Sequence, residues 1–247
     1  QRAAMATILS KPNSLYLFAD QMRGDCLGSY TDSQVLTPNL DRLAAGGVTF
    51  TRCMSNSPLC VPARAALMTG QLPRESGIWS NRSGADENGP SHVRNIRDAG
   101  YKTAVIGKTH LWRHSASGKT GLHVAEMEDN LKAWGFEDCL EINDPIETGW
   151  MDCHYTDYLA RKGLLDAHRD FIMTWVRQAY RHGDPVPWAQ VPAPVPVGDD
   201  IDSFVGLRAI EWLQRHDFTK PFYLQAQFTG PHDPYDGPQG FRDRYNP

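Results

Sequence analysis

Blocks of apolar residues alternate with polar segments along this chain, and their spacing predicts alternating strands and helices. The segment SLYLFAD (residues 14–20) is a short apolar run that ends in an acid, which is typical of a buried parallel strand with a polar residue at its carboxyl end. In TPNLDRLAAGG (residues 37–47), Leu40 and Leu43 share an apolar helical face, Thr37 can cap the first turn, and glycines end the helix. These segments predict a strand followed by a helix.

The same alternation returns further along the chain. The segment SHVRNIRDAGYKTAVIGKTHL (91–111) indicates a helix that stops near Gly100 and then a strand over Tyr101 to Ile106. DDIDSFVGLRAIEWLQRH (199–216) has helical spacing, and KPFYLQAQF (220–228) follows it as an apolar strand. Helices that alternate with apolar strands predict an α/β fold with a mostly parallel sheet flanked by helices.

Residues 112–198 have a weaker pattern. They predict one helix around DFIMTWVRQAY (170–180) and an extended surface loop in PVPWAQVPAPVPVG (185–198). No internal repeat and no shift in composition divides the chain, so we expect residues 1–247 to belong to one domain.

Composition and charge narrow the class of protein. With 247 residues and 40% hydrophobic content, the chain can bury a substantial core. The 25 Lys and Arg against 29 Asp and Glu give a net charge of −4, which offers no electrostatic case for nucleic acid or an anionic membrane as partner. No run approaches the roughly 20 apolar residues that span a bilayer.

The cysteines indicate a reducing compartment. There are five of them, widely spaced and without a CxxC pair, which argues against a disulfide framework and against a structural zinc site. We see no signal peptide and expect a cytoplasmic location, with the periplasm or secretion as the alternative if a signal has been removed.

Polar residues stand at the carboxyl ends of the predicted strands, where ligands bind in open parallel sheets. Asp20 and Gln21 follow the first strand, Lys108 and His110 the second, and His232 the third. The carboxylate and the amide oxygen are hard ligands suited to Ca²⁺ or Mg²⁺. The alternative is that Asp20 only caps a turn.

The segment SPLCVPARAALMTG (57–70) places a thiol at the start of a helix. Pro62 suits the first turn and Gly70 ends the segment, so Cys60 lies at the helix N-terminus, where backbone N–H groups and the helix dipole favour an anion. Arg64, one turn on, adds a donor for a tetrahedral oxyanion. From these residues alone, Cys60 is either an activated thiolate nucleophile or a buried, inert thiol.

CVPAR (60–64) matches the C-x-P-x-R signature of the type I sulfatases, and the chain resembles that family. Further blocks are similar to sulfatase blocks and stand in family order. They are LFADQMRGDCLGSY, TPNLDRLAAGGVTFTRCMSNSPLCVPARAALMTGQLPRESGIW, IRDAGYKTAVIGKTHL and PFYLQAQFTGPHDPY. The resemblance is dense over 14–111, good over 200–236 and loose between them.

The resemblance implies an alkaline-phosphatase-like fold and an enzyme that hydrolyses small-molecule sulfate esters. It implies that a formylglycine-generating enzyme oxidises Cys60 to formylglycine, whose hydrate is the nucleophile and which Arg64 stabilises. It also implies that Asp20, Gln21 and Cys60 hold a divalent metal, calcium by family usage, with magnesium or manganese as alternatives.

By the same resemblance, Lys108 and His232 contact the sulfate and assist the leaving group, and His110 bonds to the diol and helps to release sulfate. Further metal ligands are expected beyond His232. The resemblance therefore implies that the chain is the N-terminal portion of a catalytic domain, is inactive by itself, and needs a missing C-terminal segment or chain.

Two other functions stay open. The same scaffold serves phosphonate monoester or phosphodiester hydrolases, and the pair formed by Lys108 and His110 favours sulfate. A non-catalytic family member is the other, and it predicts an unmodified Cys60.

Overall fold

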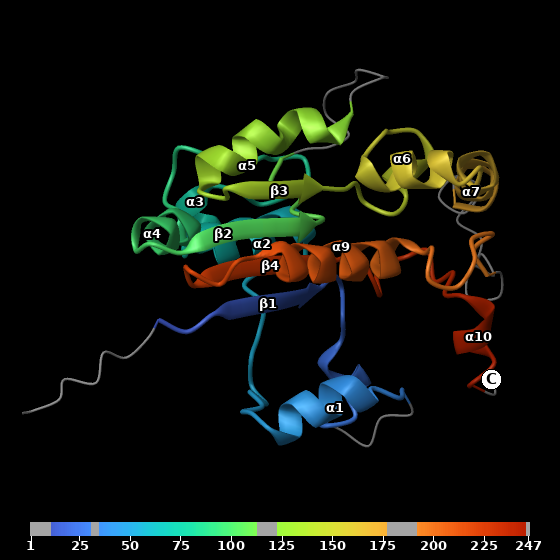
Figure 1. Cartoon of the computed structure of the whole chain (residues 1–247), viewed down its shortest axis with the longest axis horizontal. Coiled ribbons are helices and arrows are strands. Elements are labelled where there is room, and N and C mark those ends of the chain that lie inside the picture. The colour runs from blue at the N-terminus through green and yellow to red at the C-terminus, as the bar shows by residue number, and fades with distance from the viewer. Residues whose placement is uncertain (1–10, 31–34, 113–122, 177–191, 246–247) are drawn as a thin grey trace, which may run out of the picture.

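A parallel four-stranded sheet forms the centre of the molecule, in a computed structural model that describes residues 11–30, 35–112, 123–176 and 192–245 (Figure 1). The strand order is β1, β4, β2, β3, and all pairings are parallel. The predicted α/β fold is confirmed, and three predicted strands are present within two residues of their expected bounds. The strands are β1 (Ser14–Ala19), β4 (Phe222–Phe228), β2 (Lys102–Gly107) and β3 (Asp138–Glu141).

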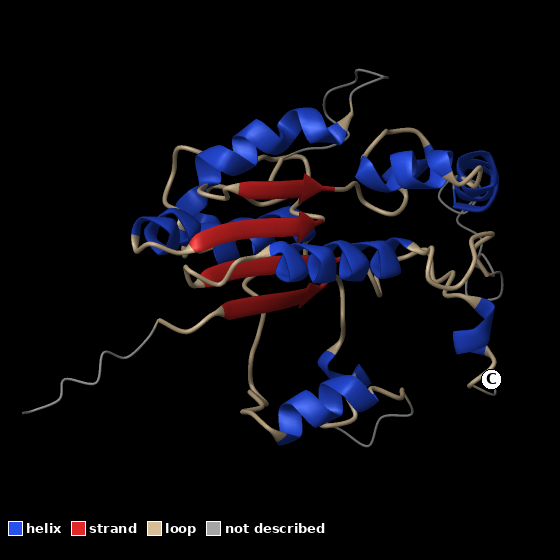
Figure 2. Cartoon of the chain, in the orientation of Figure 1, coloured by secondary structure: helices blue, strands red, loops and turns tan. Residues whose placement is uncertain are grey.

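Helices cover both faces of the sheet (Figure 2). On one face, α9 (Ile201–Arg215) packs Phe204 and Val205 against Leu224 of β4. On the other, Met68 and Val93 join the cluster that contains Val105 of β2. Strand β2 is buried on both faces, which explains why its sequence is almost continuously apolar. The second face is formed by α2 (Cys60–Thr69), α3 (Pro73–Ser76), α4 (His92–Asp98) and α5 (Glu128–Trp134).

The weakly patterned middle of the chain contains short elements at the carboxyl end of the sheet. A helix was predicted over residues 170–180. In the structure, α7 begins at Leu165 and ends at Phe171, and a π-helical stretch follows it. Residues 177–180 lie outside the described residues. Of the predicted surface loop, 192–198 is irregular, but Val195 is buried in the core. The elements are 3-10 turns at Val124–Met127 and Glu147–Gly149, then α6 (His154–Arg161), α7 (Leu165–Phe171) and the π stretch Ile172–Val176.

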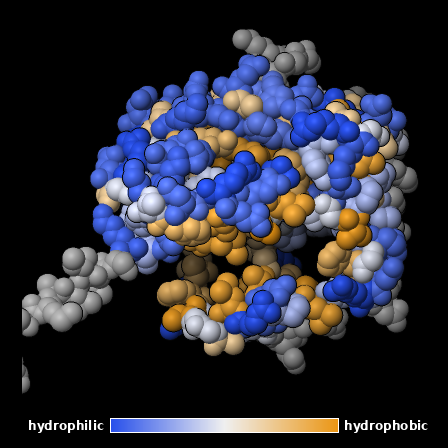
Figure 3. All heavy atoms as spheres, in the orientation of Figure 1, coloured by the Kyte–Doolittle hydropathy of each residue, from blue (hydrophilic) through white to orange (hydrophobic). Residues whose placement is uncertain are grey.

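The predicted first helix is present as α1 (Pro38–Ala45), but it lies apart from the sheet and has no buried residue. Its apolar face is open, because Leu43 is 65% exposed and no described element covers it. The expected Thr37 cap is wrong: the hydroxyl donates to the Asp41 carboxylate instead of accepting from a helical N–H. Figure 3 shows apolar side chains around the hollow between α1 and the sheet.

Two short helical elements remain. A 3-10 turn, Gly24–Cys26, follows β1, and α10 (Gln239–Arg242) follows the loop after β4. Among the described residues, no helix combines the length and the apolarity that crossing a bilayer requires.

Candidate active site

The carboxyl ends of β1, β2 and β4 bring most of the predicted site residues together at one edge of the sheet. A cavity of about 310 Å³ opens there between the end of β1 and the start of α2. Lys108, directly after β2, and His232, in the loop after β4, both approach the carboxylate of Asp144. The residues that line the cavity include Asp20, Gln21, Cys60 and Arg64.

Cys60 is the first residue of α2, as the sequence predicts. Its Sγ lies 3.9 Å from Oδ1 of Asp20. The helix has no cap from its own N-cap residue; instead, the Asn81 side-chain oxygen accepts the N–H of Val61 at 3.0 Å. One of the N–H groups that was expected to face an anion is therefore already occupied.

A buried lysine bridges two carboxylates beside Cys60. Nζ of Lys108 lies 2.6 Å from Oδ2 of Asp20 and 2.6 Å from Oδ2 of Asp144, and the lysine is fully buried. Burial, the largest effect, raises the pKa of each carboxyl group, but the Lys108 charge and hydrogen bond together with the charges of Arg64 at Asp20 and His232 at both groups outweigh it, so the pKa values of Asp20 and Asp144 lie below their usual range. Conversely, burial lowers the pKa of Lys108, and the two carboxylates more than reverse that effect.

Asp144 was not predicted from the sequence. It lies three residues after β3, a strand that the sequence analysis did not find, although its position beyond a carboxyl strand end is the signal that located the other residues. Oδ2 of Asp144 is 3.8 Å from Nε2 of His232. The carboxylate therefore faces both predicted substrate-binding residues.

His232 lies in the loop after β4, between cis peptide bonds at Gly230–Pro231 and Asp233–Pro234. Its Nδ1 donates to the carbonyl oxygen of Asp233 at 2.7 Å, which leaves Nε2 facing the site. Burial lowers the pKa of this imidazole, but the hydrogen bond with Cys60 and the Asp144 charge outweigh it and raise the pKa to about 9. The raised pKa favours the protonated form of His232, which can donate a proton.

Arg64 is buried at the wall of the cavity. It is 2% exposed, its guanidinium lies 4.7 Å from the centre of the Phe18 ring, and Nη2 is 3.4 Å from Oδ2 of Asp20. Both hydrogens of Nη1 are used, one by the carbonyl oxygen of Lys108 and one by Oε1 of Gln227. Nη1 is therefore not available to an oxyanion, whereas Nε and Nη2 make no hydrogen bond with the described residues, so the expected binding of an oxyanion by Arg64 stays a prediction.

Gln21 and His110 both adopt positive φ angles, of 59° and 48°. Gln21 is exposed at the rim of the cavity, whereas His110 is 7% exposed and close enough to Asp144 to help lower its pKa. Next to His110, the carboxyl group of Glu141 accepts the N–H of Thr109 at 2.9 Å. Complete burial raises the pKa of Glu141 to about 8.

The site offers ligand atoms for a cation. Atoms of Asp20, Cys60 and His232 lie within 4.8 Å of one another, and Gln21 adds an amide oxygen at the rim of the same cavity. Calcium takes six to eight oxygen ligands, so the described residues provide only part of a calcium shell.

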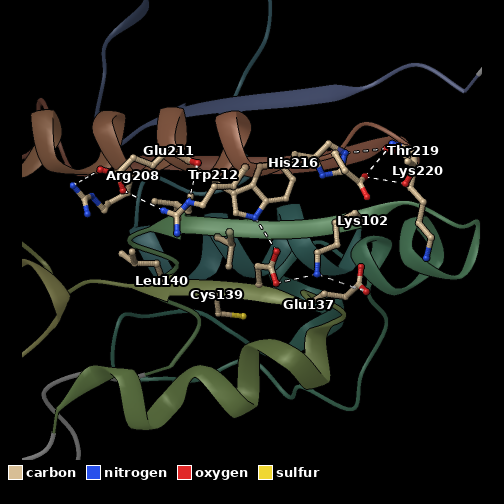
Figure 4. A pocket seen from close by; sticks show the side chains of 15 residues that line it. Lys102, Glu137, Cys139, Leu140, Arg208, Glu211, Trp212, His216, Thr219 and Lys220 are labelled. Atoms are coloured by element: carbon tan, nitrogen blue, oxygen red, sulfur yellow. Dashed lines mark hydrogen bonds and ion pairs between the residues drawn. The ribbon is translucent and has the colours of Figure 1, made fainter.

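A wider groove of about 730 Å³ lies between α9 and β3 (Figure 4), but it contains none of the predicted site residues. Several of its charged groups form ion pairs: Lys102 lies 2.9 Å from Asp138, which also accepts the indole N–H of Trp212, and Arg208 lies 2.7 Å from Glu211. The chemistry therefore points to the smaller cavity.

The signature at Cys60 and its surroundings agree with a comparison against known families, in which the sulfatase family matches residues 12–246. The chain belongs to the sulfatase family. An arylsulfatase of Clostridium perfringens is 29% identical over 248 residues, and the match covers 95% of this chain and 46% of that protein. A choline-sulfatase of Rhizobium meliloti is 28% identical over 239 residues, with coverages of 95% and 41%.

Among solved structures, the phosphonate monoester hydrolase of Agrobacterium radiobacter matches this sulfatase-family chain with a TM-score of 0.71 and 25% identity. The match covers 96% of this chain and 44% of that one. The chain thus spans less than half the length of the relatives it matches, which fits the expectation that it is one portion of a larger catalytic domain.

Proposed function

We propose that the protein to which this chain belongs hydrolyses sulfate monoesters with a formylglycine made from Cys60. The observation that carries the proposal is the place of Cys60: the residue of the sulfatase signature begins α2 and lies beside Asp20 and the positively charged His232. A nucleophile placed between a carboxylate that would ligate a metal and a proton donor is the arrangement that transfer of a charged group requires.

Each site residue of this chain has a separate role in the proposed reaction. Converted to formylglycine, residue 60 supplies the nucleophilic oxygen as a hydrated aldehyde. His232 holds a proton on Nε2 and gives it to the ester oxygen as that group leaves. Lys108, which is buried between Asp20 and Asp144, would supply positive charge beside the sulfate. His110, beside Asp144, accepts a proton from the nucleophile residue when sulfate is released.

Asp20, Gln21 and the oxygen of the modified residue 60 would hold a divalent metal, for which calcium is our proposal. These three residues suit a hard cation because all of their ligand atoms would be oxygens once the Cys60 thiol is converted. A bound cation would balance negative charge on the transferring sulfate. The remaining ligands would come from the part of the protein beyond this chain.

Phosphonate ester hydrolysis is the second candidate. The specific observation in its favour is the similarity to the phosphonate monoester hydrolase of Agrobacterium radiobacter. Both esters present tetrahedral oxyanions, so the charges of Lys108 and His232 suit either. We prefer sulfate because the curated relatives with matches over most of the chain include an arylsulfatase and a choline-sulfatase.

The test uses the full-length protein, co-expressed with a formylglycine-generating enzyme, and compares 4-nitrophenyl sulfate with a 4-nitrophenyl phosphonate ester. We expect the sulfate to have the higher kcat/KM, and Cys60→Ala to lose turnover of both esters. A higher kcat/KM for the phosphonate would select the second candidate. Mass spectrometry of the peptide containing Cys60 must also show the aldehyde, because an unconverted thiol in active protein would contradict the mechanism.

A further inference from the structure

The central strand β4 buries two glutamines, which is unusual for a strand that is paired on both sides. Leu224 and Ala226 pack into the apolar cluster under α9, whereas Gln225 and Gln227 point to the opposite face. Gln225 is fully buried and Gln227 is 4% exposed. A buried carboxamide is costly unless its donors and acceptor find partners, so these side chains need an explanation.

The explanation is a continuous hydrogen-bonded chain of side chains along that face of β4. Nη1 of Arg64 bonds to Oε1 of Gln227 at 2.5 Å, and Nε2 of Gln227 bonds to Oε1 of Gln225 at 2.6 Å. Nε2 of Gln225 then bonds to the hydroxyl of Tyr223 at 2.9 Å, which lies 2.9 Å from Nε2 of His92. The chain ends where Nδ1 of His92 meets the carbonyl oxygen of Met68 at 3.1 Å.

Arg64 fixes the direction of every bond in this chain. A guanidinium has no acceptor, so Gln227 must turn its oxygen toward Arg64 and its NH₂ toward Gln225. Gln225 is then forced to present its oxygen to Gln227 and its NH₂ to Tyr223. Each donor therefore points away from the Arg64 charge, and such aligned bonds polarise and strengthen one another.

The tyrosine hydroxyl continues the same direction. Since it accepts from Gln225, its proton goes to Nε2 of His92, and Nδ1 of His92 donates to the carbonyl oxygen of Met68. The chain thus runs from the floor of the candidate active site to the start of α4.

We propose that Gln227 is a positioning residue for Arg64, held in one orientation by Gln225, Tyr223 and His92. The inference rests on the proposed function, because it assigns Arg64 a place beneath the nucleophile. Gln227 anchors Nη1 so that Nη2 faces Asp20, whose other oxygen faces Cys60. The buried polar residues of β4 therefore hold Arg64 in its position beside Asp20.

The kinetic test substitutes Gln227 in the full-length, converted enzyme. Gln227→Met keeps the length of the side chain but removes the acceptor, and we expect kcat to fall about tenfold or more while KM changes less than about twofold, since small misplacements of catalytic groups are costly. Gln227→Glu restores an acceptor for Arg64 and should recover most of kcat. Tyr223→Phe, two links away, should lower kcat less than Gln227→Met.

Thr103→Val is the matched control. Thr103 is a fully buried polar residue of the adjacent strand β2, and its hydroxyl donates to the carbonyl oxygen of Gly135, outside the chain of bonds. We expect kcat of Thr103→Val to equal that of the wild type. If Thr103→Val lowers kcat as much as Gln227→Met, or if Gln227→Glu is as slow as Gln227→Met, the positioning role is wrong.

A stability measurement tests the link without relying on activity. Arg64→Met leaves Oε1 of Gln227 without its donor, and Gln227→Met leaves Nη1 of Arg64 without that acceptor. The double variant removes both groups, and the loss of the Gln225 donor is the same with or without Arg64, so its loss in Tm should be smaller than the sum of the single losses. Gln227→Met combined with Thr103→Val should be additive. Additive losses for Arg64 and Gln227 would overturn the proposed link. If the wild type hydrolyses no sulfate ester, the proposed function is wrong. The Tm comparison then tests by itself whether Arg64 and Gln227 are coupled.

Discussion

Oδ2 of Asp144 lies 2.6 Å from Nζ of Lys108, a pair that exists because β3 ends beside β2. Gly107 of β2 is in register with Glu141 of β3, so the residues that follow the two strands meet. Asp20 holds the other side of the same ammonium group at 2.6 Å. The lysine that the family resemblance assigns to sulfate is therefore held by carboxylates from two different strand ends.

Asp144→Asn should destabilise the protein and slow turnover. Removing one charge of a buried pair typically costs about 3 kcal/mol, and Lys108 would be free to shift toward Asp20. Urea unfolding and the kcat of the full-length enzyme measure the two effects. Asp129→Asn is the control, since its ion pair with Lys132 is on the surface, and its unfolding midpoint should equal that of the wild type. Equal midpoints for the two variants would refute the structural role of Asp144.

Glu141→Gln should remove part of the pH dependence of stability. Complete burial raises the pKa of Glu141 from 4.5 to about 8. The folded state thus holds a proton that the unfolded state releases, and the contribution of this group to stability is complete below pH 4.5 and is lost as the pH rises through about 8. We expect the wild-type urea midpoint to fall over this range and the fall to be smaller in the variant.

The control for that experiment is Glu126→Gln, at an exposed position of the 3-10 turn before α5. Its pH profile should match that of the wild type. The prediction is wrong if Glu141→Gln and the wild type lose stability in parallel between pH 5 and pH 8.

Gly107→Ala should be among the most damaging single substitutions in the sheet. Gly107 has a φ of 114°, and a Cβ there would stand 1.9 Å from the carbonyl oxygen of Gln227. Because a backbone atom of the central strand cannot yield, we expect a loss of about 3 kcal/mol or more. Gly163→Ala, with a φ of 69° and open space around it, should lose only about 1 to 2 kcal/mol. Similar unfolding free energies for the two variants would contradict this.

The cysteines should differ strongly in their reactivity toward iodoacetamide at pH 8. Cys53 is exposed and should react first. Burial, followed by the charge of Glu128, raises the pKa of Cys139 to about 12, so it should react slowly. Cys153 is fully buried and should react only after unfolding. Peptide mapping after timed labelling gives the order, and labelling of Cys153 as fast as Cys53 would mean that the core near α6 opens readily.

Strands with continuous apolar runs could be found from the sequence, whereas β3 could not. β3 has the sequence DCLE and only one buried residue, because it is an edge strand that pairs with β2 alone. Its polar composition is what an edge strand allows, and a four-residue segment with this pattern gives little signal. Missing β3 also meant missing Asp144, since its place beside Lys108 depends on that pairing.

The sequence by itself determined the class of fold, the order of the main elements and the location of most site residues at strand ends, since local apolar periodicity and turn residues act over a few positions. It also carried the signature at Cys60. Only the tertiary structure decided how the charges pair: Lys108 between two carboxylates, and Arg64 turned inward onto Gln227. Such pairing depends on which strands are neighbours and on how deeply each group is buried. The spacing of residues along the chain predicts neither of these.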